Sequence, residues 1–315
     1  MRKRHLISSS DPVPRRHQSV LLHEALRNLD IQPNDIVVDA TLGSAGHARA
    51  IAHKLGLTGK LIGIDADAAA IERSKTALKD FHNTQILLIE DNFRNLDLIL
   101  RTAKCTRITK ALFDLGWSSE QLGAGRGFSF QKEEPLLMTF SSNQKANQLT
   151  AEKIVNEWEE QSIADVIYGW GEERYAKRIA RAIVAHRVHA PFKTAAELAE
   201  VIRGSVPVRE RFKKLHPATR TFQALRIAVN DELGALREGL TSAWRHLAVH
   251  GRIAVISFHS IEDREVKRAF AAWEKDGDAR RITRRPITPS TEEIVENPRS
   301  HSAKLRVIEK TYTKP

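Results

Sequence analysis

The stretch Asp39-Ala-Thr-Leu-Gly-Ser-Ala-Gly-His47 decides the fold of this chain. It follows the short apolar run 36–38 and precedes a helix-like segment, 48–55. A strand, a glycine turn and a helix start in this order are typical of a nucleotide-type site in an α/β sheet. Glycines let the backbone approach a ligand, and the first N–H groups of the helix are free to bind it. We therefore expect a ligand site at Asp39 and Gly43.

The residues at this turn distinguish between nucleotide ligands. Only two residues separate Gly43 from Gly46, so the dinucleotide pattern G-x-G-x-x-G is absent, which disfavours a nicotinamide oxidoreductase. The phosphate-binding pattern G-x-x-x-x-G-K-[ST] is absent as well. Asp39 would repel a pyrophosphate but attract the ammonium or sulfonium of S-adenosylmethionine (SAM). Asp65 ends the next apolar run and suits a pair of ribose hydroxyls. The alternative is an ordinary strand-to-helix turn.

Composition sets the broad class. A chain of 315 residues with 41% hydrophobic residues can form one large domain or two. Its single cysteine, Cys105, excludes an internal disulfide and a cysteine-based metal cluster, and it favours a reducing, cytoplasmic setting. The net charge of +11 favours anionic partners, nucleic acid first. No apolar run approaches the roughly 18 residues that cross a bilayer, so no membrane partner is expected.

Strands alternate with helices along much of the chain, which predicts a parallel, doubly wound sheet. The expected strands are 36–39, 61–65, 85–89, 110–114, 252–259 and 304–309. Binding sites in such sheets lie at the carboxyl ends of the strands. Four acids fall at those ends: Asp39, Asp65, Asp91 and Asp114.

The alternation of strands and helices stops between about 120 and 220. Helical patterns over 151–168, 172–189 and 194–203 follow one another there without a strand. We therefore expect an inserted helical subdomain at 123–220. The sheet domain then comprises 17–122 and 221–315, after a flexible tail at 1–16.

A long apolar stripe from Phe222 to Leu247 predicts a helix that faces the core. Arg226 and Asn230 share another face of it, which is either solvated or directed at a substrate. His259, at the end of a strand, is a candidate for the site or a buried, hydrogen-bonded histidine. Ser260 begins a helix, and with Asp263 it resembles a capping box. Four arginines are expected in a loop and offer a surface for RNA: Arg280, Arg281, Arg284 and Arg285.

Over residues 17–311 the chain resembles the bacterial 16S rRNA cytosine-N4 methyltransferases, the RsmH (MraW) family. The most specific motifs are His216-Pro-Ala-Thr-Arg-Thr-Phe-Gln-Ala-Leu-Arg-Ile-Ala-Val-Asn-Asp-Glu-Leu233 and Ser257-Phe-His-Ser-Ile-Glu-Asp-Arg264. The resemblance implies a Rossmann-like class I SAM-dependent methyltransferase sheet with a helical insertion. It also implies methylation of a cytidine amine in the decoding region of small-subunit rRNA, and a homodimer. The implied SAM contacts are Ala45, Gly46, His47, Asp65, Phe93, Asp114 and Gln121.

Asp114 is the first candidate for catalysis, because an acceptor that hydrogen-bonds the amine favours the cationic amine that develops during transfer. His259 is second. Trp117, Phe128 or Phe130 could stack on the target base, with core packing as the alternative. The substrate candidates are Arg226, Asn230, Ser260, Arg284 and Arg285.

The chain also departs from the family pattern. Ala45 stands in place of a glycine, and Trp117 in place of a small aliphatic residue. Leu137, Thr139 and Ser141 replace two acids and an arginine. These departures leave open a second hypothesis, a non-catalytic RNA-binding or ribosome-assembly protein that retains the methyltransferase fold.

Overall fold

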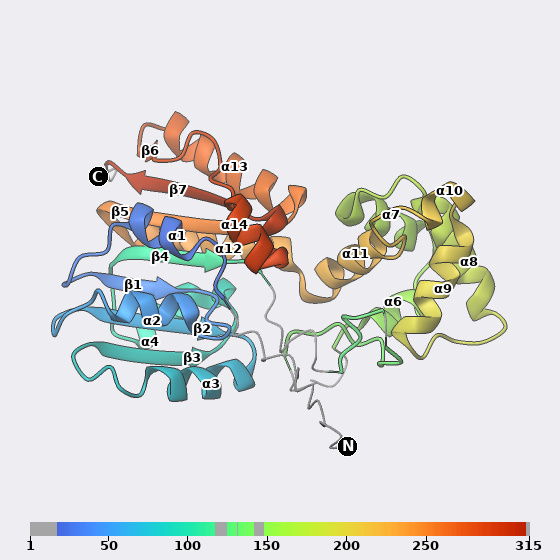
Figure 1. Ribbon diagram of the computed structural model, residues 1–315, viewed down its shortest axis with the longest axis horizontal. Helices are drawn as coiled ribbons and strands as arrows, with labels where there is room; N and C mark the ends of the chain where they lie inside the picture. The colour runs from blue at the N-terminus through green and yellow to red at the C-terminus, as the bar shows by residue number, and fades with distance from the viewer. Residues whose placement is uncertain (1–17, 117–124, 131, 142–147, 313–315) are drawn as a thin grey trace, which may run out of the picture.

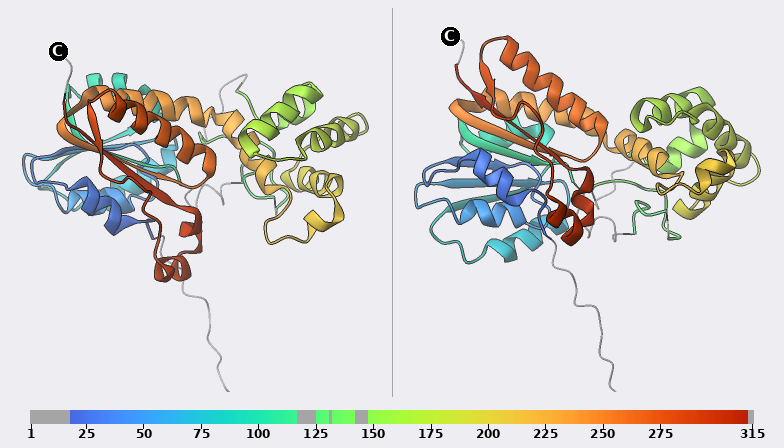
Figure 2. Two further views of the ribbon diagram at one scale, coloured as in Figure 1. Left: turned by 90° about the horizontal axis from the view of Figure 1, so that it is seen from above. Right: turned by 45° about the horizontal axis from the view of Figure 1, so that its top comes forward.

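The computed structural model describes residues 18–116, 125–130, 132–141 and 148–312, so the predicted tail at 1–16 lies outside it. Two units lie side by side (Figures 1 and 2). One is a sheet with helices on both faces, and the other is a group of helices beyond one end of that sheet. Among the described residues no helix is long and apolar enough to cross a membrane.

The sheet has seven strands in the order β3-β2-β1-β4-β5-β7-β6. The first five in this order are parallel, whereas β7 pairs antiparallel with both β5 and β6. The strands are β1 (Ile36–Asp39), β2 (Lys60–Asp65), β3 (Gln85–Glu90), β4 (Ile108–Asp114), β5 (Leu247–Ser257), β6 (Ala279–Arg281) and β7 (Lys304–Lys310). The predicted doubly wound α/β sheet is therefore confirmed, except that the strand predicted at 304–309 is antiparallel to its neighbours.

Successive residues of the central strands face opposite sides of the sheet, as the two-residue period of a strand requires. Val37 and Leu112 belong to one core with α1 (Leu22–Leu29), α2 (Gly46–Ala52) and α3 (Ala68–Leu78). Val38 and Phe113 belong to the other, with α4 (Leu96–Thr102), α12 (Glu232–His246) and α13 (Ser260–Lys275). The short element η1 (Phe93–Asn95) lies between β3 and α4, and α14 (Thr291–Glu296) and η2 (Pro298–Ser302) lie between β6 and β7.

The helical unit has a core of its own, built from aliphatic residues and phenylalanines. Its helices are α6 (Ala151–Glu157), α7 (Glu160–Gly171), α8 (Ala176–Arg187), α9 (Ala195–Ser205), α10 (Val208–Arg211) and α11 (Thr219–Asn230). Phe222 and Leu225 of α11 belong to this core. The expected domain boundary after residue 220 falls inside α11, and we propose that the unit extends to the end of that helix.

The long helix predicted from the stripe at 222–247 is two helices. Asp231 adopts a left-handed conformation, φ 45°, between α11 and α12, and Arg94 binds its carboxylate at 2.6 Å. Asp tolerates this conformation better than most residues. The break divides the stripe, because Phe222 packs in the helical unit and Leu240 packs against the sheet.

Two smaller predictions were also wrong. The segment 151–168 forms two helices, because Arg187 donates to the carbonyls of Val155 and Trp158 and so satisfies the end of α6. Arg280 and Arg281 lie in strand β6 rather than in a loop. Both are paired there, Arg280 with Glu309 and Arg281 with Glu274.

Candidate functional site

The order of the strands reverses between β1 and β4, and a pocket opens at their carboxyl ends, where ligands of such sheets bind. Residues that follow β1, β2, β3 and β4 form one side of it. Helices α12 and α13 and the segment before α6 form the other side. The lining includes Thr41, Gly43, Asp65, Asp91, Phe93, Asp114, Gly116, Phe140, Asn230, Glu232 and Glu262.

Asp65 fixes the glycine turn. Its Oδ2 accepts the N–H of Gly43 at 2.8 Å, and its Oδ1 accepts the N–H of Asp67 at 2.9 Å. Burial raises the pKa of this carboxyl, while the two backbone donors oppose the shift. Because each carboxylate oxygen has a second lone pair, Asp65 can still accept a ribose hydroxyl from the pocket.

The turn itself packs tightly. Gly43 has φ +53°, and a Cβ on Gly46 would lie 1.9 Å from the Oγ of Ser19. Ala45 caps α2 in the left-handed conformation, φ 60°, which glycine adopts at lower cost. The backbone N–H groups of the turn remain at the helix start, and the departure at Ala45 costs conformational strain rather than a donor.

Asp39 is fully buried at the end of β1. One oxygen accepts the N–H of Thr41 at 3.3 Å, and the other has no hydrogen-bond partner among the described residues. Burial raises the pKa of Asp39 to about 7, and the nearby carboxylates of Asp114 and Asp65 add to the shift. Such an acid fits a cationic ligand, because a nearby positive charge would stabilise its ionised form. An anionic pyrophosphate does not fit.

Asp114 is held in place at the end of β4. Its backbone N–H donates to the hydroxyl of Thr41 at 2.6 Å, and its Oδ1 accepts the N–H of Gly116 at 3.1 Å. Its Oδ2 lies 3.5 Å from Nδ1 of His47, which is buried at the start of α2. His47 therefore orients Asp114 from behind, while the carboxylate lines the pocket.

Phe93 lies at the end of the pocket nearest β3. Its ring meets Phe113 edge to face at 5.6 Å. A Cβ on Gly239 of α12 would lie 2.7 Å from this ring, so glycine is needed there for the close approach. Asp91 accepts hydrogen bonds from the backbone of Asn92 and the side chain of Asn95. Phe93 is thus an apolar, rigid wall that suits an adenine ring.

On the opposite side, Asn230 holds the segment before α6. Its Oδ1 accepts the N–H of Phe140 at 2.9 Å, and its Nδ2 donates to the carbonyl of Met138 at 2.8 Å. Arg126 donates to the carbonyl of Phe140 and lies 3.5 Å from Asp67, at the start of α3. Phe140 stacks on Phe128 with ring centroids 6.1 Å apart. These contacts present Phe140 to the pocket.

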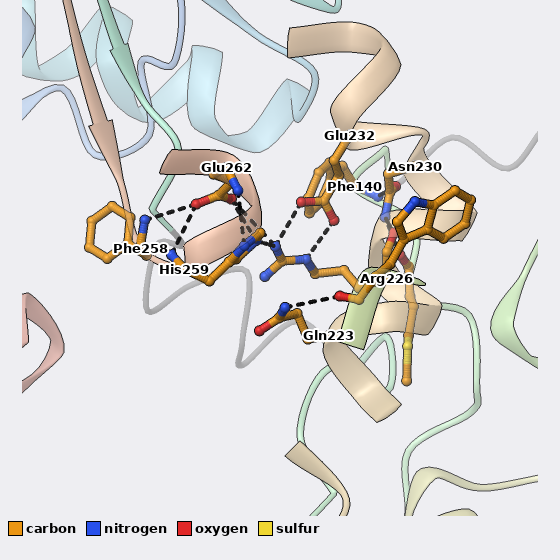
Figure 3. A network of polar contacts seen from close by, with 10 residues as sticks. Phe140, Gln223, Arg226, Asn230, Glu232, Phe258, His259 and Glu262 are labelled. Atoms are coloured by element: carbon orange, nitrogen blue, oxygen red, sulfur yellow. Dashed lines mark hydrogen bonds and ion pairs between the residues drawn. The ribbon is translucent and has the colours of Figure 1, made fainter. Parts of the chain in front are cut away.

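Arg226 is buried at the centre of a polar network (Figure 3). It forms a bidentate pair with Glu232, lies 3.7 Å from Glu262, and lies 3.4 Å from Nε2 of His259. Burial raises the pKa of Glu232, although Arg226 opposes the shift. Burial also acts to raise the pKa of Glu262, but His259 and Arg226 outweigh it and the pKa is lowered. Arg226 therefore organises the pocket wall and is not free to bind an RNA phosphate.

Glu232, His259 and Glu262 offer atoms within 4.8 Å of one another, an arrangement that could hold a metal ion. The guanidinium of Arg226 already lies against all three side chains. It supplies the positive charge that two neighbouring buried carboxylates need.

The expected capping box at Ser260 and Asp263 is wrong by one residue. His259 caps α13: its Nδ1 accepts the N–H of Glu262, and the carboxylate of Glu262 accepts the N–H of His259. Imidazole nitrogen can replace a hydroxyl as this acceptor. Ser260 instead donates to Glu172 of the helical unit at 2.6 Å, and Asp263 binds Arg306. Ser260 thus joins the two units.

The other candidates lie elsewhere. Arg284 and Arg285 are exposed beyond β6 and do not line the pocket. Phe130 packs against Phe222 and His216 in the helical unit. Gln121 and Trp117 lie outside the described residues.

The region where the sheet unit and the helical unit meet, which we call the junction, includes three glutamates that sequence reasoning did not single out: Glu172, Glu232 and Glu262. Glu262 carried a usable signal, since it follows His259 by three residues at a helix start, the spacing of a capping box. Glu172 carried none, because its partners Ser260 and Arg264 are about 90 residues away.

The chain is similar to a known protein family and to several solved structures. The model of the MraW methylase family matches residues 14–311. Solved structures of similar fold include an rRNA methylase from Streptococcus thermophilus, with 14% identity, coverage of 92% of this chain and 94% of that one, and a TM-score of 0.44. A proposed methyltransferase from Streptococcus mutans, in complex with SAH, has 13% identity, coverage of 92% and 96%, and a TM-score of 0.41.

Proposed function

The chain belongs to the MraW methylase family, and we propose that it transfers the methyl group of SAM to the N4 amine of a cytidine in the decoding region of 16S rRNA. SAM-dependent methyl transfer and the Rossmann-like class I sheet are properties of the family. One observation carries the proposal for the amine: Asp114, fixed at the end of β4, presents a carboxylate to the same pocket that Asp65 and Phe93 line.

The cofactor would be held by residues at the ends of the first three strands. SAM supplies an electrophilic methyl group when it is bound. Asp65 would accept the ribose hydroxyls, and Phe93 would pack on the adenine. Burial disfavours the ionised form of Asp39 and raises its pKa, and the positive charge of the cofactor would stabilise that form. Positioning of the two reactants can supply ~7–11 kcal/mol of the barrier.

Asp114 would act on the amine. The N4 nitrogen of cytosine is conjugated with the ring, and it becomes cationic as it accepts the methyl. A carboxylate that accepts its N–H favours that change, and His47 and Gly116 fix the orientation of Asp114 beforehand. The conjugated amine is a poor proton donor before it accepts the methyl group and a good one once it is cationic, so we place proton loss after transfer.

The target base would enter from the junction of the two units. A paired base is hidden within a helix, so the cytidine has to be looped out or flipped into the pocket. Phe140 lines the pocket and is backed by Phe128, which makes it the best-placed aromatic ring for stacking on the base. An rRNA substrate would also place the protein in the cytoplasm with assembling ribosomal subunits.

The test is methylation of RNA in small ribosomal subunits from cells that lack this protein. Purified protein and labelled SAM are added, and nucleosides are then identified by mass spectrometry. We expect N4-methylcytidine at one position, with Asp114→Ala as the inactive control. Methylation of another atom would overturn the target but leave the family function. A protein that does not bind SAM in calorimetry would instead be the non-catalytic RNA-binding protein.

A further inference from the structure

The segment 208–215, which comprises α10 and the turn after it, exposes apolar and basic side chains together. Phe212 is 83% exposed, Val208 61% and Leu215 52%. The same eight residues hold four cations, Arg209, Arg211, Lys213 and Lys214, against one acid, Glu210. Apolar side chains that are exposed together and rimmed by polar residues, rather than singly, mark interaction sites.

The backbone of this segment is anchored from beneath. Arg211 donates to the carbonyls of Val206 and Gly204 at the end of α9. His216, directly after the segment, stacks on Phe130 with ring centroids 4.4 Å apart and planes 17° apart. These contacts fix the backbone that carries the exposed side chains. Binding a partner would therefore require little further ordering of the backbone.

Two groups of polar contacts hold further cations between this segment and the edge of the pocket. Glu210 contacts Arg174, Arg209 and Lys213. Glu172, two residues before Arg174 in the chain, accepts from Arg264 and from Ser260, and its backbone carbonyl accepts from Arg220. Ser260 directly follows His259, whose ring contacts Glu262 in the pocket wall.

We call the five cations Arg174, Arg209, Lys213, Arg220 and Arg264 the basic band. They contact the acidic residues Glu172 and Glu210. All five side chains are exposed. These cations run from the sheet unit across the junction to the outer part of the helical unit, where Figure 1 shows α10.

We propose that the basic band and Phe212 bind the RNA strand that flanks the target base, with phosphates on the cations and one nucleobase stacked on Phe212. This inference rests on the proposed function for its substrate. Basic side chains interleaved with an exposed aromatic ring are typical of proteins that bind single-stranded nucleic acid. The net charge of the chain, +11, favours an anionic partner such as nucleic acid over a protein.

The test uses two labelled probes, a hairpin of the decoding region and an oligouridine of about 15 nucleotides, the upper range of a single-strand site. The double variant R209A/K213A removes two cations of the band. Its affinity for both probes should fall at least about tenfold at low salt, and the slope of log K against log salt should flatten by about 1.4, since each lost phosphate contact on a single strand accounts for ~0.7.

The matched control, K75A/K79A, removes two exposed lysines at α3 on the far edge of the sheet. It lowers the net charge equally and should change affinity less than threefold. Phe212→Ala should weaken binding by about 5- to 150-fold, the range for one stacked base, with no change in salt slope. SAM affinity and the melting temperature should not change in any variant.

The outcomes separate the two proposals. Equal losses of RNA affinity in R209A/K213A and its control, or no loss in Phe212→Ala, would overturn the proposal that the basic band binds RNA. This holds even if the protein methylates rRNA normally. Because oligouridine contains no cytidine, a loss of oligouridine binding supports the band even if no N4-methylcytidine forms. If Phe212→Ala abolishes dimerisation in sedimentation and leaves RNA affinity unchanged, the segment is an interface between copies of the chain.

Discussion

The two sides of the pocket are built differently. On the cofactor side, the contacts that fix Asp39 and Asp65 join residues 2 or 22 positions apart in the chain. On the junction side, Asn230 reaches residues 90 and 92 positions away, and Ser260 reaches Glu172 across 88. The cofactor side therefore depends on two neighbouring strands, β1 and β2, and the turns that follow them, whereas the junction side exists only when the helical unit has docked.

The electrostatics of the two sides differ as well. Among the described residues no ion pair contains Asp39 or Asp65 on the cofactor side, and burial raises the pKa of both carboxyls. On the junction side Arg226 neutralises Glu232 and Glu262, and Arg306 neutralises Asp263. Uncompensated buried acids indicate a place for a bound cation, while a compensated network holds a structure together. The contrast gives each side a different expected response to mutation.

The largest effect should come from the junction side. Arg226→Met leaves Glu232 and Glu262 buried without their cation, and it should cost about 3–5 kcal/mol of unfolding free energy in urea. Arg237→Met is the matched control on α12, since Arg237 forms an exposed pair with Glu265 and should cost no more than about 1 kcal/mol. Similar losses of unfolding free energy in both variants would show that the buried network around Arg226 contributes no more to stability than an exposed ion pair.

Replacing Asp39 should stabilise the folded protein at pH 8, whereas replacing Arg226 should destabilise it. A carboxyl whose folded pKa is about 7 against an unfolded value near 3.8 favours the folded state fully below about pH 4, and this contribution is lost as pH rises to 7. Asp39→Asn should therefore be more stable than the wild type at pH 8, by up to about 4 kcal/mol, and equal to it near pH 4.

The same variant separates stability from cofactor binding. The ratio of wild-type to Asp39→Asn affinity for SAM should rise between pH 6 and 8, because only the wild type gains a negative charge there. Calorimetry at three pH values measures this ratio. A constant ratio would mean that Asp39 does not balance the charge of the cofactor.

Asp114 tests the chemistry at the point where the two sides meet. Single-turnover rates with saturating SAM should follow the order Asp114, then Asn, then Ala, because asparagine keeps one acceptor oxygen. The Ala variant should lose ~10²–10³-fold, typical for one preorganised transition-state contact. Equal inactivity of Asn and Ala with SAM still bound would favour a general base instead. Normal turnover by both would remove Asp114 from the reaction.

The smallest effect concerns Ala45. Ala45→Gly relieves a left-handed strain of ~1–2 kcal/mol but increases the entropy of the unfolded chain and removes a buried methyl. The net change in unfolding free energy should stay within about 1 kcal/mol, and SAM affinity should not change, because the backbone N–H is kept. A tenfold shift in SAM affinity would show that the side chain at 45 shapes the cofactor site.

The sequence by itself determined the sheet and the cofactor side. Apolar runs that end in Asp39, Asp65 and Asp114 are local patterns, and parallel strands necessarily bring their carboxyl ends to one edge. The strand positions, the glycine turn and the acids at the edge therefore followed from neighbouring residues. Gly43, Asp65 and Asp114 line one pocket, while Asp39 is fully buried at the end of β1.

Tertiary structure alone decided the junction side. The periodicity of residues 222–247 is continuous, but the helix breaks at Asp231, where Arg94 from another part of the chain binds the carboxylate. The sequence predicted that Arg226 lies on a face that is either solvated or directed at a substrate. Arg226 is buried, because Glu232 and Glu262 converge on it only after α11, α12 and α13 have packed. Helical spacing fixes which residues share a face, but what that face meets depends on contacts between distant segments, which carry no local pattern.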